Sequence, residues 1–171
     1  DICYVTSSRA EPLLKTSNKK IKTFYIGEGV ARTKFFLNLQ ADILIMTMPD
    51  LETFHIKRSK IYPVHYIYIF HAMVSTHLVY RKNAFDHFDS IFCVGEYQIE
   101  EIRSTEKIYN LKPKNLVRCG YTHLDNLIKK NTIEYKSKNN NDKQTQILLA
   151  PSWGKNGLFE TNIEEIIDIL L

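Results

Sequence analysis

The stretch at residues 66–71, Tyr-Ile-Tyr-Ile-Phe-His, determines how we interpret both the fold and the site. A short run that is almost wholly apolar is typical of a parallel strand that is buried on both faces. The run ends at His71, and a loop follows in which Ser75, His77 and Arg81 stand close together in sequence. Ligands of open α/β sheets bind outside the carboxyl ends of the strands, which is where this loop begins. We therefore take His71 as a candidate general base, with a structural role at the strand end as the alternative.

Apolar runs and helical periodicity alternate along the first 130 residues. The runs that predict strands are residues 2–6, 21–26, 42–46, 65–70, 90–94 and 116–118. The segments with apolar residues at helical spacing are 28–39, 98–109 and 122–130. Strands that alternate with helices predict an α/β fold, namely a Rossmann-like, mostly parallel sheet with helices on both faces.

The composition changes after residue 130. Residues 131–146 are polar and rich in asparagine, which is typical of a surface linker. Residues 147–150 are apolar again and predict a strand, and residues 160–171 carry isoleucine and leucine at the spacing of an amphipathic helix. We therefore predict a first domain over residues 1–130, a linker, and the start of a second Rossmann-like domain over residues 147–171.

Charge and cysteine content narrow the class of protein. The net charge is +4, and the 23 Lys and Arg residues are spread along the 171-residue chain, which argues against a dedicated nucleic-acid-binding module. A modest positive charge fits phosphate-bearing substrates or an anionic membrane surface. Cys3, Cys93 and Cys119 each lie in an apolar run, which indicates reduced packing residues rather than disulfides or a metal site.

Six stretches, taken in order along the chain, carry a resemblance to a known family. They are residues 46–51 (Met-Thr-Met-Pro-Asp-Leu), 57–60 (Lys-Arg-Ser-Lys), 70–71 (Phe-His), 84–90, 95–103 and 149–154 (Leu-Ala-Pro-Ser-Trp-Gly). Together they resemble the CDP-glycerol glycerophosphotransferase-like proteins, bacterial enzymes that build teichoic acids and phosphate-linked capsule polymers. The resemblance implies a GT-B architecture, in which an acceptor-side domain and a nucleotide-binding domain face each other across a cleft.

The resemblance also implies a reaction and a catalytic residue. In the teichoic-acid polymerases of the family, a histidine at a strand end begins a His-Gly-Thr-Pro-Leu-Lys motif and is taken as the catalytic base. His71 stands at the matching place, although the next four residues, Ala-Met-Val-Ser, depart from the motif. The implied chemistry is attack by an acceptor hydroxyl on the β-phosphorus of a CDP-activated polyol with release of CMP, and it requires no metal or other cofactor.

Other residues are candidates for binding the substrates. Ser75, His77 and Arg81 follow the candidate base. Ser152, Trp153 and Gly154 lie between the predicted strand and helix of the second domain, where backbone N–H groups approach a phosphate closely; the alternative is an ordinary turn. The basic run at residues 57–60 is either a contact for anionic lipid or polymer, or a solvated surface.

We expect a polyol-phosphate transferase of cell-envelope polymer synthesis. Its partners would be a CDP-polyol donor and a lipid-linked or polymer hydroxyl acceptor, with peripheral contact at the cytoplasmic face of the membrane and no nucleic acid. The alternatives are a GT-B nucleotide-sugar glycosyltransferase or epimerase, and a non-catalytic acceptor-binding fragment. The chain begins without methionine and ends within a predicted helix, so we expect a piece of a longer protein that shows no turnover alone.

Overall fold

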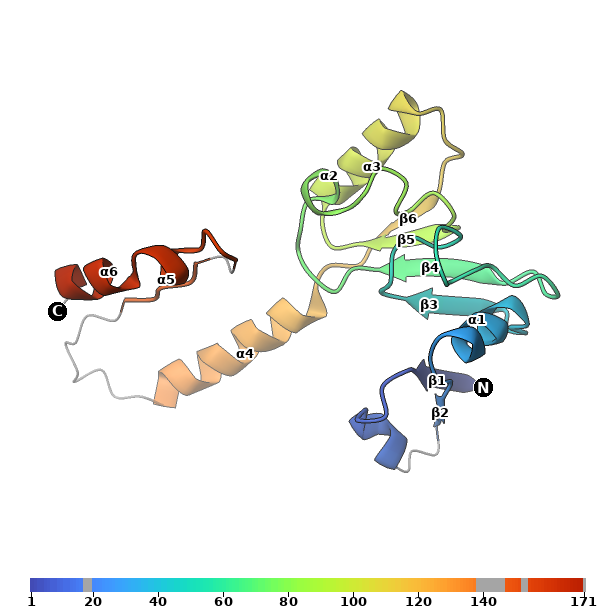
Figure 1. Ribbon diagram of the computed structural model, residues 1–171, viewed down its shortest axis with the longest axis horizontal. Helices are drawn as coiled ribbons and strands as arrows, with labels where there is room; N and C mark the ends of the chain where they lie inside the picture. Colours follow the sequence, from blue (N-terminus) through green and yellow to red (C-terminus); the bar gives the residue numbers. More distant parts are fainter. Residues whose placement is uncertain (17–19, 138–146, 152–153, 171) are drawn as a thin grey trace. The chain divides into compact units, whose positions relative to one another are not determined.

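The computed structural model describes residues 1–16, 20–137, 147–151 and 154–170, and the fold is α/β (Figure 1). The strands are β1 (Ile2–Thr6), β2 (Ile21–Tyr25), β3 (Ile43–Met46), β4 (His65–Ile69), β5 (Ser90–Cys93) and β6 (Asn115–Arg118). The helices are η1 (Pro12–Lys15), α1 (Val30–Leu37), α2 (Thr76–Val79), α3 (Glu96–Ile108), α4 (Thr122–Ser137), α5 (Leu158–Thr161) and α6 (Ile163–Leu170). The predicted strands of the first 130 residues are thus confirmed.

The six strands form two parallel sheets. In the larger sheet the order is β3-β4-β5-β6, and β1 pairs with β2 in a separate two-stranded sheet. The predicted α/β class with a parallel sheet flanked by helices is confirmed, and the six strands divide between two sheets because neither β1 nor β2 pairs with a strand of the larger sheet. The alternation of strand and helix along a chain predicts the number of strands, and it does not determine which strands become neighbours.

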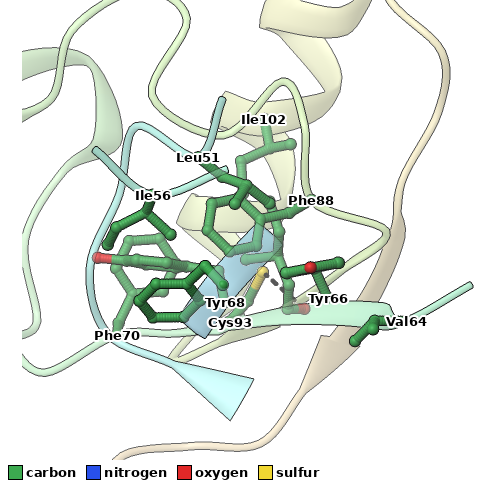
Figure 2. Packing of buried hydrophobic residues seen from close by; sticks show 11 residues of the cluster. Leu51, Ile56, Val64, Tyr66, Tyr68, Phe70, Phe88, Cys93 and Ile102 are labelled. Atoms are coloured by element: carbon green, nitrogen blue, oxygen red, sulfur yellow. Dashed lines mark hydrogen bonds between the residues drawn. The ribbon is translucent and has the colours of Figure 1, made fainter. Parts of the chain in front are cut away.

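The hydrophobic core lies against one face of the larger sheet. Tyr66 and Tyr68 of β4 are almost fully buried there, and Phe36 of α1 and Ile102 of α3 join the same cluster. Figure 2 shows the ring of Tyr68 within this packing; its centroid lies 4.9 Å from that of Phe70, with the two rings edge to face. The strand that leads to His71 is therefore anchored in the best-buried part of the molecule.

The three cysteines are free thiols, and they differ in burial. Cys93 is fully buried on β5, and burial raises the pKa of its thiol to about 11. Cys3 and Cys119 are exposed, so the prediction that all three are packing residues is right for Cys93 and wrong for the other two. A side chain in an apolar run lies in the core only if its side of the strand is covered.

The chain divides into two compact units, Asp1–Asn126 and Leu127–Leu171. In the second unit, the strand predicted over residues 147–150 is not formed, and Leu148 is 88% exposed. A strand is held by hydrogen bonds to a neighbouring strand, and the described part of this unit contains helices alone. The helix predicted over residues 160–171 is present in two pieces, α5 and α6, which are separated at Asn162.

Helix α4 continues into the stretch predicted as a linker. It runs to Ser137, so residues 131–137 are helical rather than linker, and residues 138–146 lie outside the described part of the chain. Lysine and glutamate are good helix formers, so a segment with few apolar residues still extends a helix that has already begun. None of the described helices has the length and apolar character needed to cross a membrane.

Candidate functional site

His71 lies where the sequence predicts it, directly beyond the carboxyl end of β4. Phe70 is 3% exposed and fills the core, whereas the His71 side chain is exposed. The imidazole makes no hydrogen bond to any residue that the structure describes. The backbone of His71 is held instead, because its carbonyl oxygen accepts a hydrogen bond of 2.8 Å from the Tyr121 hydroxyl. The imidazole is therefore available to a ligand, while the backbone of His71 is held in place by Tyr121.

Tyr121 belongs to the β6 side of the larger sheet, in which β5 lies between β6 and β4. It follows β6, and the preceding Gly120 has a φ of +72°, in the left-handed region where a side chain would be strained. The ring of Tyr121 also packs edge to face on His123, at 5.9 Å between centroids. No three His, Cys, Asp or Glu side chains among the described residues gather closely enough to hold a metal ion.

The loop at residues 71–75, which we call the His71 loop, is held by two polar side chains of α3. Gln98 is completely buried; its amide nitrogen donates to the Val74 carbonyl oxygen at 2.9 Å, and its oxygen accepts from the Val94 N–H at 2.9 Å. One turn further along the helix, Glu101 accepts hydrogen bonds from the first residue of α2. The Thr76 N–H lies 2.6 Å from one carboxylate oxygen, and the Thr76 hydroxyl lies 2.7 Å from the same oxygen.

The Ser75 hydroxyl belongs to this framework as well. It donates to the other oxygen of Glu101 at 2.8 Å, so the structure engages it with α3 rather than leaving it open to a substrate. Desolvation alone would raise the pKa of Glu101. The hydrogen bonds from Thr76 and Ser75 outweigh that effect, and the pKa is lowered overall. Glu101 is therefore a carboxylate at neutral pH and an acceptor for the start of α2.

Arg81 makes an ion pair on the same edge of the sheet. Its guanidinium lies 2.9 Å from a carboxylate oxygen of Asp50 and 4.4 Å above the ring of Phe54. Asp50 follows β3 and has a φ of 64°, a strained conformation for a residue with a side chain. The Arg81 side chain remains 58% exposed, so donors of its guanidinium still face solvent.

His77 and Arg81 line one pocket of about 240 Å³ between α2 and the carboxyl-terminal half of α3. The charged side chains in its wall are Arg81, Lys82, Lys114, Asp86 and Glu106, and the wall also contains His77, Tyr80 and Tyr109. Lys114 is buried and pairs with Glu106 at 3.8 Å, while the Lys82 ammonium lies 3.6 Å from the centre of the Tyr109 ring. Arg81 is paired with Asp50, so the fixed charges of the wall nearly balance, and the exposed donors of Arg81 remain open to a ligand. His71 and Ser75 are not part of this wall.

The basic run at residues 57–60 is built into the fold at the opposite edge of the sheet. The Arg58 guanidinium donates to the His87 carbonyl oxygen at 2.7 Å and pairs with Asp89 at 3.0 Å. It also lies 4.4 Å above the Tyr66 ring. A larger hollow of about 570 Å³ opens beside it, but this is the amino edge of the strands, where ligands of parallel sheets are uncommon.

The predicted donor loop lies in the second unit. Ser152 and Trp153 fall outside the described residues. Gly154 has a φ of +130° and accepts a hydrogen bond of 2.7 Å from the Gly157 N–H, so it forms a tight turn before α5. Of the predicted site residues, the structure thus brings His77 and Arg81 into one pocket and ties Ser75 to the loop that begins at His71.

Sequence reasoning assigned no role to Asp50, Gln98, Glu101 or Tyr121. Gln98 and Glu101 carried a signal, because they stand three residues apart on the same helix face as the buried Ile102. Polar residues on the inward face of a helix indicate a hydrogen-bonding task. Nothing in the sequence indicates that Tyr121 contacts His71, since the two residues stand 50 positions apart.

Comparisons of the chain with protein-family models, with curated proteins and with solved structures found no match. The resemblance to the CDP-glycerol glycerophosphotransferase-like family therefore stays a prediction, and so do the roles that it implies.

Proposed function

We propose that this protein transfers a phosphopolyol from a CDP-activated donor to a hydroxyl acceptor, with His71 as the general base. The proposal rests on one observation above all. The exposed imidazole of His71 lies just beyond the carboxyl end of a buried parallel strand, and the backbone carbonyl oxygen of His71 accepts a hydrogen bond from Tyr121. An alcohol is a poor nucleophile until a base removes its proton, and imidazole is the side chain best suited to this task near neutral pH.

The reaction balances without a further reagent. The acceptor oxygen forms a bond to the β-phosphorus of the CDP-polyol, and its proton passes to the ring of His71. The bond between the β-phosphorus and the bridging oxygen breaks, and CMP leaves with the electron pair. Negative charge spreads over the phosphate oxygens as this happens, so nearby cationic donors lower the barrier.

The pocket wall does not include His71, so we assign to it the phosphate groups of the acceptor rather than the hydroxyl that His71 would deprotonate. His77 and Arg81 supply donors for an anionic group, and the volume of about 240 Å³ suits a small polyol phosphate better than a bulky ligand. We assign the phosphates of the CDP-polyol donor to the loop of Ser152, Trp153 and Gly154. The acceptor would be a lipid-linked or polymer hydroxyl, reached by peripheral contact at the cytoplasmic face of the membrane.

The test measures CMP release from CDP-glycerol and CDP-ribitol with a lipid-linked acceptor. It uses the natural gene product that contains this sequence. His71→Ala and His71→Gln should each lower kcat by about 10²–10⁴-fold, the usual contribution of a general base. Gln keeps hydrogen bonding but does not take a proton at neutral pH, so it should not rescue activity.

The matched control is His55→Ala, which removes an exposed histidine elsewhere on the chain and should leave the rate unchanged. A His71→Ala protein with a near-normal rate would return His71 to a structural role. Sugar transfer from a nucleotide sugar, with no CMP release from either CDP-polyol, would favour a glycosyltransferase instead.

A further inference from the structure

The backbone around His71 is held from two other elements of the fold. The Tyr121 hydroxyl, from beyond β6, donates to the His71 carbonyl oxygen at 2.8 Å. Gln98 of α3 donates to the Val74 carbonyl oxygen at 2.9 Å, and Glu101 of α3 accepts from Ser75 and Thr76 at 2.6–2.8 Å. These contacts span residues 71–76, from the second residue after β4 to the first residue of α2.

The residue types on the inward face of α3 indicate a specific hydrogen-bonding task. Burying an amide or a carboxylate costs free energy unless every polar group finds a partner, and the partners found here include backbone groups of the loop, of the start of α2 and of the turn before α3. A Ser or Thr at the start of a helix needs no distant carboxylate to be capped. Gln98 lies at 0% exposure; its amide nitrogen donates to Val74 of the His71 loop, and its oxygen accepts from the Val94 N–H just before α3. What these contacts provide is a fixed position for the loop.

We propose that Gln98, Glu101 and Tyr121 are positioning residues that hold the His71 imidazole in place for its proton transfer; this inference rests on the proposed function. A general base works only within hydrogen-bond reach of the proton that it removes. A displacement of about 1 Å costs on the order of 10²-fold in rate, so the connection between β4 and α2, which is six residues long (70–75), needs support from outside. Tyr121 acts on His71 itself, and the α3 pair acts on the other end of the loop.

The first experiment compares variants that remove single contacts with variants that remove similar groups elsewhere. Tyr121→Phe deletes one hydroxyl, and its control Tyr62→Phe deletes a hydroxyl that bonds to Asp42, which precedes β3. Glu101→Ala deletes three acceptor contacts, and its control Glu100→Ala deletes an exposed carboxylate on the same helix. Glu101→Gln keeps one carbonyl oxygen as an acceptor and should rescue part of the loss.

Two readouts separate positioning from a merely structural role. In the natural gene product, kcat for CMP release should fall about 10-fold or more in Tyr121→Phe and Glu101→Ala, with the KM for the CDP-polyol unchanged within about 2-fold. Independently of turnover, hydrogen exchange of the Thr76 amide should accelerate at least about 10-fold in Glu101→Ala, because its acceptor is gone. The two control variants should match the wild type in both measurements.

The outcomes distinguish the two proposals. If the wild type releases no CMP from any CDP-polyol, the proposed function fails, whereas hydrogen exchange still reports whether Glu101 holds the loop. Unchanged Thr76 exchange in Glu101→Ala would overturn the inference. A wild type that turns over, together with variants of lower melting temperature but unchanged kcat, would also overturn it, because the residues would then act on stability alone.

Discussion

The two ends of β4 are built in opposite ways. At the amino end, Arg58 uses its own side chain to hold the fold, with hydrogen bonds to the Val64 and His87 carbonyl oxygens and an ion pair to Asp89. At the carboxyl end, the His71 backbone is held by Tyr121, and the imidazole makes no hydrogen bond within the described part of the chain. A conspicuous charged residue is thus committed to structure at one end, and a titratable side chain is left available at the other.

This difference gives a rule for choosing between residues that look equally functional in sequence. A side chain is free for chemistry when other residues hold its backbone in place. By this rule Arg58 and Ser75 are structural, since Arg58 is paired and the Ser75 hydroxyl bonds Glu101. His71 fits the functional class, and Arg81 lies between the two because it pairs with Asp50 yet stays 58% exposed.

The largest expected effect on stability is at the amino end. Arg58→Ala should lower the free energy of unfolding by about 2–3 kcal/mol, because the Asp89 carboxylate loses its cation and two carbonyl oxygens lose a charged donor. Arg58→Lys should recover little, since an ammonium lacks the planar fork that reaches both carbonyls.

Urea unfolding measures the Arg58 effect, with Lys60→Ala as the control. Lys60 belongs to the same basic run but is exposed, so its removal should change stability by less than about 0.5 kcal/mol. A loss as small in Arg58→Ala as in Lys60→Ala would mean that the run is a solvated surface throughout, contrary to the contacts of Arg58.

The next largest effect is at the buried amide of α3. Gln98→Leu keeps a similar volume but leaves the Val94 N–H and the Val74 carbonyl oxygen without their partner. An unpaired buried polar group costs about 1–3 kcal/mol, which should appear in the urea midpoint without a change in the slope. A Leu variant as stable as the wild type would show that water satisfies both groups, and the account of Gln98 as a support for the loop would weaken.

The sequence predicts the strands well and their assembly less well. The run at residues 65–70 is apolar enough to identify β4 without knowledge of its neighbours, and β4 begins at the predicted residue and ends one residue earlier. Sheet membership depends instead on contacts between distant segments, which is why the separate pairing of β1 and β2 is not readable from alternation. Residues 147–150 show the same limit, since an apolar run without a paired neighbour in the described structure is not a strand.

The candidate site is readable from sequence only in part. His71 is found because a strand and a histidine are adjacent in the chain. Its supports are not, because Tyr121 lies 50 residues away and Glu101 lies 25 and 26 residues from its donors. The pairing of Arg81 with Asp50 is equally remote in sequence. Local patterns therefore identify the side chain that is free and miss the ones that hold it.

A smaller effect on stability should depend on pH, and it concerns Glu101, which holds the loop beyond the carboxyl end of β4. The pKa of Glu101 is lowered in the folded protein, so its carboxylate adds stability that is complete above the pKa of an unfolded glutamate and is lost as the pH falls through the folded value. Glu101→Gln should therefore melt below the wild type at pH 7, and the gap should close as the pH falls below about 4. Thermal melts at pH 7 and pH 3.5 measure this, with Glu100→Gln as the control. A gap that stays constant would show that Glu101 acts through its shape rather than its charge.

The smallest effect on stability should come from His65, which is the first residue of β4, and His71, which lies just beyond its end; the two histidines form a matched pair. The His65 ring nitrogen lies 2.8 Å from the Ser90 hydroxyl, so His65→Ala should cost about 1 kcal/mol of unfolding free energy. His71→Ala should cost less than about 0.5 kcal/mol, because the ring is exposed and alanine keeps the carbonyl that accepts from Tyr121. Urea unfolding of the two variants side by side tests the difference. If His71→Ala is the more destabilising, the imidazole is a structural part of the strand end, and the contrast between the two ends of β4 no longer holds.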